Sequence, residues 1–102
     1  MTVRLYLDDS RPFPAGYEGC RSIETAQQLL LINRCELISL DYNLGFKRPT
    51  GLDLLRWMKE NNVFVPRINI HSTHPLGRIL MWRYAKENFP DSEVTATPSP
   101  FA

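Results

Sequence analysis

Two short apolar segments of this chain both end at carboxylates, and this repetition constrains the fold more than any other feature. Val3–Leu7 runs into Asp8 and Asp9, and Cys35–Leu40 runs into Asp41. Each segment has the length and apolar content of a buried strand, and a helical pattern separates the two. Strands that alternate with helices predict parallel crossovers, whose carboxyl ends meet at one sheet edge. We therefore expect the three carboxylates to converge.

The rest of the chain continues the alternation of strand and helix. Helical patterns begin at Thr25, at Thr50 and at Pro75, and further strands are expected at Gly19–Ile23 and Arg67–Ile70. The segment from residue 12 to residue 19 contains two prolines and two glycines, which indicates a loop.

The starts and inward faces of these helices follow from local patterns. Thr25 with Gln28 resembles a capping box, and Thr50 is a capping residue for the second helix. Apolar spacing predicts the inward-facing residues, which are Leu52, Leu55 and Met58 in the second helix and Leu76, Ile79, Leu80 and Tyr84 in the third.

This order of elements predicts a compact, doubly wound α/β domain. We expect a mostly parallel sheet of four to five strands, with helices on both faces, in a flavodoxin-like arrangement. Residues 1–90 would form the domain. Residues 91–102 would form a C-terminal tail that either frays or adds a short edge strand at Glu93–Ala96.

The composition limits the class of protein and the cellular compartment that we expect for it. The chain has 102 residues, 43% of them hydrophobic and 23% charged, which is typical of one globular domain. A net charge of +1 excludes a bulk positive field for nucleic acid. Cys20 and Cys35 lack metal-type spacing and no secretory signal is evident, so a cytoplasmic protein with reduced thiols is expected. No apolar stretch approaches the roughly 18 residues of a membrane span, so no membrane partner is expected.

The converging carboxylates predict a metal site. Asp8, Asp9 and Asp41 repel one another unless a divalent cation with hard oxygen ligands, Mg²⁺ or Mn²⁺, lies between them. Asn43, two residues after Asp41, is a candidate for a further oxygen ligand. The alternative for Asp8 and Asp9 is a simple acidic turn after a strand.

A polar segment after the third clear strand predicts an anion-binding wall opposite the carboxylates. Free N–H groups at the start of the following helix favour an anion, and Ser72 and Thr73 add hydroxyl groups. Arg78, in the first turn, would reach a phosphate group, and Arg11 is a second candidate clamp. The alternatives are that Ser72 or Thr73 only caps the helix and that Arg11 is a solvated surface residue.

Two histidines in this segment are candidate proton carriers near neutral pH, because an ordinary imidazole titrates there. They are His71 and His74. The alternatives are a satisfied buried histidine for His71 and a plain loop residue for His74, which precedes a proline.

Taken together, these blocks resemble a response-regulator receiver domain, and more closely the compact variant called the cyclic-phosphate processing receiver domain. The resemblance covers residues 3–89. It is carried by Leu7-Asp8-Asp9-Ser10-Arg11-Pro12, Ile38-Ser39-Leu40-Asp41-Tyr42-Asn43-Leu44-Gly45, Thr50-Gly51, and Ile70-His71-Ser72-Thr73-His74-Pro75-Leu76-Gly77-Arg78. It implies that Asp8 and Asp9 hold Mg²⁺, that Asp41 takes the phospho-acceptor position and that Ser72 matches the receiver hydroxyl.

The chain also departs from the pattern of these families. An ordinary receiver has a helix between its first two strands and a lysine after its fifth, whereas this chain has a Pro-rich loop and no evident lysine. The compact variant usually has a second acidic residue and an asparagine where this sequence has Asn43 and His74. The missing lysine favours Asp41 as a metal ligand over Asp41 as a phosphorylated switch.

The resemblance implies metal-dependent processing or binding of a cyclic or terminal phosphate on a nucleotide or an RNA end. Asp8, Asp9 and Asp41 would hold the cation, with His71 or His74 as acid or base and Arg11 and Arg78 as clamps. One alternative is a signalling receiver with Asp41 as acceptor, and another is a non-enzymatic module that binds a nucleotide or a protein. The sequence predicts neither the oligomeric state nor the identity of the substrate.

Overall fold

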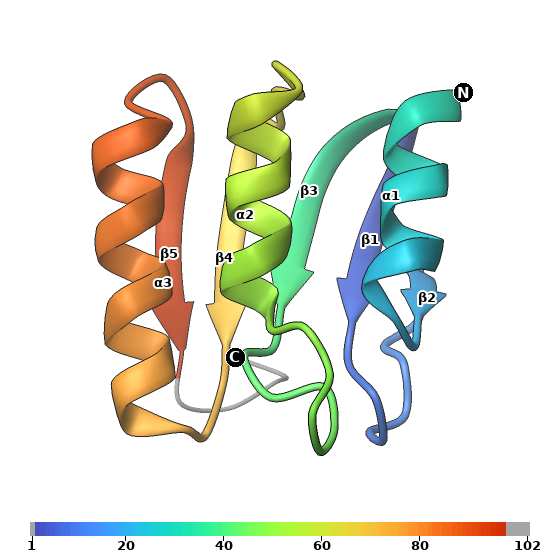
Figure 1. Cartoon of the computed structure of the whole chain (residues 1–102). Helices are drawn as coiled ribbons and strands as arrows, with labels where there is room; N and C mark the ends of the chain where they lie inside the picture. The colour runs from blue at the N-terminus through green and yellow to red at the C-terminus, as the bar shows by residue number, and fades with distance from the viewer. Residues whose placement is uncertain (1, 98–102) are drawn as a thin grey trace.

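The computed structural model describes residues 2–97, which form a five-stranded sheet and three helices (Figure 1). The strands lie in the order β2-β1-β3-β4-β5, which is the flavodoxin-like order, and each pairing is parallel. This confirms the predicted fold class. The strands are β1 (Thr2–Leu7), β2 (Glu18–Cys20), β3 (Arg34–Leu40), β4 (Arg67–His71) and β5 (Glu93–Thr97), and the helices are α1 (Ile23–Ile32), α2 (Gly51–Glu60) and α3 (Pro75–Asn88).

The placement of the helices differs from the expectation that they cover both faces. Figure 1 shows α1, α2 and α3 on the same face of the sheet. Each of them connects two strands in the same direction across the sheet, so right-handed crossovers put them on one side. The connection that runs the other way, from β1 to β2, is the loop of residues 8–17. Within residues 2–97, the second face therefore carries no helix.

The core lies between the sheet and this single helical layer. Alternate strand residues face the helices and are fully buried, namely Leu5, Leu7, Ile38, Leu40, Ile68 and Ile70. Helix α2 buries Leu52, Leu55 and Met58, as its spacing predicts. This alternation, with one apolar face, leaves the other face of the sheet free for polar side chains.

Helix α3 presents a different face to the core from the one that the sequence predicts. Leu76, Ile79 and Leu80 are 61%, 47% and 39% exposed, whereas the buried residues of the helix are Gly77, Met81 and Ala85. A side chain at Gly77 would overlap the ring of Tyr42, so close approach of the helix to the loop after β3 selects this face. The spacing of large apolar side chains does not predict this face, because the helix makes its closest contacts through small residues.

The helix starts are set by capping residues. Helix α1 begins two residues earlier than predicted, because Ser22 caps it by accepting a hydrogen bond from the N–H of Thr25. The cap predicted at Thr50 is confirmed, and Asp53 completes a capping box there. The Asp53 carboxylate also fixes the loop just before α2, where it accepts from the N–H of Thr50 at 2.8 Å.

The segment after residue 90 adds an edge strand, since β5 pairs along β4 from Arg67–Glu93 to His71–Thr97. The Pro98, Ser99 and Pro100 positions of the expected tail lie outside the described residues. In residues 2–97 there is no helix that combines the length and the apolar character of a membrane span.

Candidate functional site

The register of the sheet brings the acidic residues together. Leu7 pairs with Leu40, and the N–H of Asp41 donates to the carbonyl of Leu7 at 3.0 Å. Asp8 and Asp41 therefore follow adjacent strands at the same level. This is also where the chain reverses its direction across the sheet, since β1 connects to β2 on one side and β3 to β4 on the other. Ligands of open α/β sheets bind at such a point.

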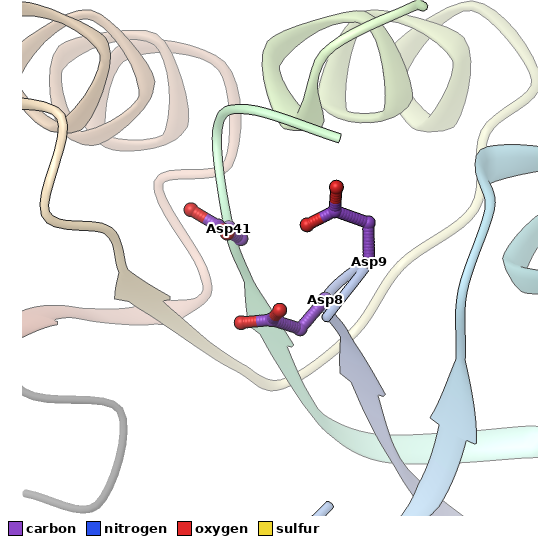
Figure 2. Close-up of side chains that lie close together, drawn as sticks. All are labelled: Asp8, Asp9 and Asp41. Atoms are coloured by element: carbon purple, nitrogen blue, oxygen red, sulfur yellow. The ribbon is translucent and has the colours of Figure 1, made fainter. Parts of the chain in front are cut away.

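The three carboxylates form one cluster beyond the ends of β1 and β3 (Figure 2). One carboxylate oxygen from each of Asp8, Asp9 and Asp41 lies within 4.8 Å of the others. Asp8 is buried, Asp9 is exposed and Asp41 is intermediate. The structure thus places together the three side chains that the sequence predicts to converge.

Asp8 is fixed in place by several donors. Its Oδ1 atom accepts from the N–H groups of Ser10 at 3.0 Å and Arg11 at 2.9 Å, and its Oδ2 atom lies 3.2 Å from Nε2 of His71. Burial raises the pKa of Asp8, but the N–H groups of Arg11 and Ser10, together with His71, outweigh burial and hold the pKa below its ordinary value. Asp8 is therefore an anchored carboxylate with its charge already balanced.

The charge of Asp41 is less compensated than that of Asp8. Its Oδ1 atom accepts from the N–H of Tyr42 at 2.8 Å. Burial, and next the negative charge of Asp8, raise the pKa of Asp41, while a hydrogen bond with Ser72 opposes them. A cation placed between Asp8, Asp9 and Asp41 would relieve this repulsion.

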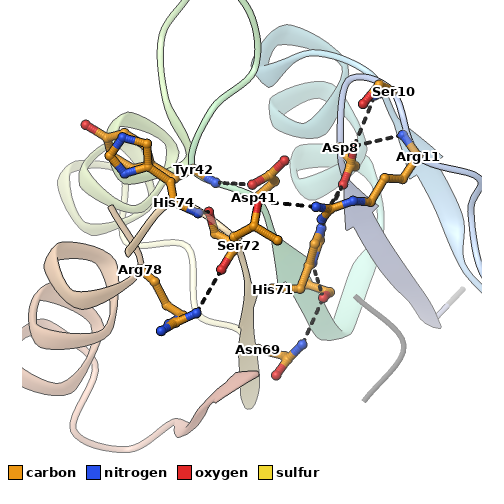
Figure 3. A network of polar contacts seen from close by, with 12 residues as sticks. Asp8, Ser10, Arg11, Asp41, Tyr42, Asn69, His71, Ser72, His74 and Arg78 are labelled. Carbon is orange, nitrogen blue, oxygen red and sulfur yellow. Dashed lines mark hydrogen bonds and ion pairs between the residues drawn. The ribbon is translucent and has the colours of Figure 1, made fainter. Parts of the chain in front are cut away.

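His71 lies beneath the cluster and is fully buried. Its ring stacks on Tyr6 with centroids 4.1 Å apart. Nε2 faces Asp8 (Figure 3), and Nδ1 lies 2.6 Å from Oγ of Ser39. Burial lowers the pKa of His71 to about 4, although Asp8 opposes this. His71 is thus a neutral, internal group that supports Asp8.

A buried neutral histidine makes stability depend on pH. The unfolded chain protonates His71 near pH 6.5, whereas the folded chain does so only near pH 4. Between these values the unfolded state binds more protons, so we expect the free energy of unfolding to fall as the pH falls through this window. Asp41 acts in the opposite sense at pH values above 3.8, because its pKa in the folded state is raised from that value. Urea denaturation of the wild type and of His71→Gln at several pH values measures the effect, and equal slopes for the two proteins would contradict it.

A cavity of about 800 Å³ opens beside the cluster. One wall carries Asp9 and Asp41, and the other is the start of α3 with the residues before it. The lining residues are Asp9, Ser10, Arg11, Asp41, Asn43, Gly45, Phe46, Lys47, Ser72, Thr73, His74 and Pro75. Of the predicted site residues, Asp8, His71 and Arg78 do not line it.

The wall at the start of α3 is ordered by its own hydrogen bonds. His74 caps the helix, because its Nδ1 accepts from the N–H of Gly77 at 2.9 Å. The cap expected from Ser72 or Thr73 is therefore supplied by His74, and Ser72 Oγ instead accepts from the N–H of His74 at 3.2 Å. Arg78 donates to the carbonyl of Ser72 at 3.2 Å, so it holds the loop from behind.

Arg11 reaches across the cavity between the two walls. Its Nη2 donates to Oγ1 of Thr73 at 3.4 Å, and its Nη1 lies 3.6 Å from Oδ2 of Asp8. That Nη1 atom is buried and has no hydrogen-bond partner among the described residues. Arg21 fixes the loop behind it by donating to the carbonyls of Asp8 and Arg11 at 3.2 and 2.7 Å. A guanidinium held in this way is ready to donate to an anion.

Asn43 lies on the cavity, although part of its bonding capacity is used locally. Its Oδ1 atom accepts from the N–H of Gly45 at 3.1 Å and closes the turn after β3. Gly45 adopts a φ of 123°, which favours glycine at this position. As a metal ligand, Asn43 would use the remaining lone pair of the same oxygen.

The donor set fits a hard divalent cation. Carboxylate oxygens within 4.8 Å of one another, with Asp9 and Asp41 open to the cavity, are ligands that Mg²⁺ and Mn²⁺ take. Mg²⁺ commonly uses one or two carboxylates and keeps several waters, so the cluster is sufficient.

Reasoning from the sequence missed several residues that shape the site. Ser39 and Asn69 hydrogen-bond to one another behind His71, and Arg21 holds the first loop. A polar residue between Ile38 and Leu40 was a weak signal for Ser39. Arg21 and Asn69 gave no local signal, because their roles depend on the packing of distant segments.

Comparison with known proteins agrees with this geometry. The family model described as the cyclic-phosphate processing receiver domain matches residues 3–87. Among solved structures, a signal receiver domain from Vibrio parahaemolyticus, named as part of a Luxo repressor protein, superposes with a TM-score of 0.65 at 20% identity. The match covers 96% of this chain and 80% of that one. No curated protein matches the chain.

Proposed function

Because the chain belongs to the cyclic-phosphate processing receiver domain family, we propose that it binds a divalent cation at Asp8, Asp9 and Asp41 and processes a cyclic or terminal phosphate on a nucleotide or RNA end. The observation that carries this proposal is the pairing of two unlike walls on one cavity. Asp9 and Asp41 of the acidic cluster lie on one wall, and the other offers hydroxyl groups beside Arg11, whose buried Nη1 atom faces Asp8 at 3.6 Å but has no hydrogen-bond partner among residues 2–97. A metal-bound phosphate needs both kinds of wall.

The cation would polarise a phosphate oxygen and neutralise the negative charge that develops during ester cleavage. Arg11 lines the cavity and would donate from its guanidinium group to a phosphate oxygen, and Ser72 and Thr73 offer hydroxyl groups nearby. His74 is exposed at the cavity, and its Nδ1 accepts from Gly77, so its Nε2 carries the hydrogen. His74 would therefore act as a hydrogen-bond donor to the phosphate group.

The rim of the cavity supports a ligand that carries a base. Phe46 is 90% exposed, and Nζ of Lys47 lies 5.5 Å from the centre of its ring. An exposed aromatic ring beside a cation, at the rim of the cavity, suits the stacking of a nucleobase. A phosphate without a base would leave this part of the rim unused.

The test is a turnover assay with a panel of phosphates. The protein is incubated with Mg²⁺ or Mn²⁺ and with 2′,3′-cyclic nucleotides, 3′,5′-cyclic nucleotides, RNA that ends in a 2′,3′-cyclic phosphate, and a base-free cyclic phosphate. We expect opening of a cyclic ester, followed by ³¹P NMR, that chelator abolishes and that is faster for base-bearing compounds. The absence of both turnover and binding across the panel would overturn the proposal, whereas binding without turnover would leave a non-enzymatic binding module.

A phospho-accepting receiver is the second candidate function. The observation in its favour is that Asp41 lines the cavity beside Ser72, which is the receiver arrangement implied by the resemblance. Incubation with beryllofluoride or a small phosphodonor would then modify the wild type and not Asp41→Asn. Labelling that survives in Asp41→Asn would exclude it.

A further inference from the structure

A row of polar side chains crosses the face of the sheet that carries no helix. Ser39 on β3 pairs with Asn69 on β4, and Asn69 pairs with Thr95 on β5. Ser39 is 2% exposed, Asn69 is intermediate and Thr95 is exposed. A buried hydroxyl group costs free energy unless it is hydrogen-bonded, and neither sheet packing nor the apolar core requires one at Ser39.

These side chains form an unbroken chain of hydrogen bonds that ends in the acidic cluster, and Figure 3 shows the part of it from Asn69 to Asp8. Oγ1 of Thr95 lies 2.8 Å from Oδ1 of Asn69, and Nδ2 of Asn69 lies 3.0 Å from Oγ of Ser39. Oγ of Ser39 lies 2.6 Å from Nδ1 of His71, whose Nε2 lies 3.2 Å from Oδ2 of Asp8. Four consecutive bonds therefore connect the edge strand β5 to the cluster.

The direction of donation along this chain is fixed from its acidic end. The carboxylate of Asp8 only accepts, so Nε2 of His71 must carry a hydrogen. A neutral imidazole has one N–H, so Nδ1 accepts and the hydroxyl of Ser39 donates to it. The Ser39 oxygen then accepts from the amide of Asn69, whose own oxygen accepts from Thr95. Each group donates toward Asp8, an arrangement in which successive bonds polarise one another.

We propose that Ser39, Asn69 and Thr95 are positioning residues that hold His71 in its Nε2–H form and, through it, fix the orientation of the Asp8 carboxylate for cation binding. The part of this inference that concerns the cation rests on the proposed function. Outer partners of this kind orient metal ligands and tune their basicity. The row thus gives the helix-free face a role in the site on the sheet edge.

The test reads the protonation of the His71 ring nitrogens by ¹⁵N NMR in the metal-free protein, and Mn²⁺ affinity by calorimetry. Asn69→Asp keeps the shape of the side chain but removes the donor to Ser39, so the Ser39 hydroxyl should turn toward the new carboxylate. Ser39→Ala removes the bond to Nδ1 altogether. Ser92→Ala is the matched control, since its hydroxyl donates to the carbonyl of Val65 at 2.7 Å, outside the row.

In the wild type and in Ser92→Ala we expect the ¹⁵N shift of an acceptor nitrogen at Nδ1. In Asn69→Asp we expect the shift of a protonated nitrogen there, and in Ser39→Ala roughly tenfold weaker Mn²⁺ binding. Thr95→Val, at an exposed position, should also alter the Nδ1 shift. This variant tests the inference if a variant at a buried position fails to fold. An unchanged Nδ1 shift in the folded variants would overturn the inference. Failure of the wild type to bind Mn²⁺ would instead count against the proposed function, because the ring spectra need no metal.

Discussion

Replacement of Asp41 by asparagine is expected to abolish Mn²⁺ binding while raising the melting temperature of the metal-free protein. The first effect follows because Asp41 lines the cavity, as Asp9 does, and its charge is less compensated than that of Asp8. We expect affinity to fall by more than roughly a hundredfold, beyond the range for residues that only orient a ligand. The second effect follows because burial and Asp8 raise the pKa of Asp41, so its ionised form opposes folding at neutral pH.

Thermal denaturation with and without Mn²⁺ separates these two effects. A bound cation stabilises the folded state by mass action, so the wild type should melt at a higher temperature with Mn²⁺ and Asp41→Asn should not respond. Asp91→Asn is the matched control, since Asp91 is exposed and lies far along the chain from the cluster. A melting temperature of Asp41→Asn that still rises with Mn²⁺ as in the wild type would show that Asp41 is not a ligand.

The fold could be predicted from the sequence where local signals are strong. The apolar segments that end at Asp8 and Asp41 gave two central strands and the sheet edge at which they meet. The single helical layer could not be predicted from local patterns, because it depends on the strand order, which sets the direction of each crossover across the sheet. The inward face of α3 was not predicted, because Gly77 and Ala85 are buried on it and such small residues add little to an apolar pattern.

The sequence predicts most of the residues that form the site, but it predicts the role of each residue less well. Asp9 and Thr73, each the second residue after the end of a strand, could be placed at this edge of the sheet from topology alone. The role of His71 depends on its burial, which its position at the end of a strand does not predict. In the structure this candidate proton carrier is buried and contacts Asp8. The partner of His71 across the sheet, Ser39, follows only from the register of strands that are 32 residues apart at this contact.

The same packing that positions the cluster makes Gly51 sensitive to substitution. Gly51 starts α2, and its N–H donates to the carbonyl of Tyr42 at 3.0 Å. A Cβ atom there would overlap the backbone carbonyl oxygen of Asp41 and lie 2.8 Å from the Met81 methyl group. The methyl group is the end of a flexible side chain and can move, whereas the carbonyl belongs to the segment that holds the Asp41 carboxylate in place.

We therefore expect Gly51→Ala to destabilise the fold by about 1–3 kcal/mol, the range for overpacking a close contact, and to weaken Mn²⁺ binding as the Asp41 segment shifts. The coupling of the two losses is the informative result, because a purely helical effect would favour alanine over glycine within α2. Arg56→Ala is the control in the same helix, since this exposed side chain pairs with Asp53 at the surface and its removal should change stability by less than about 0.5 kcal/mol. Urea denaturation and Mn²⁺ titration of both variants measure these effects. If Gly51→Ala kept the stability and Mn²⁺ affinity of the wild type, the start of α2 would not constrain the acidic cluster.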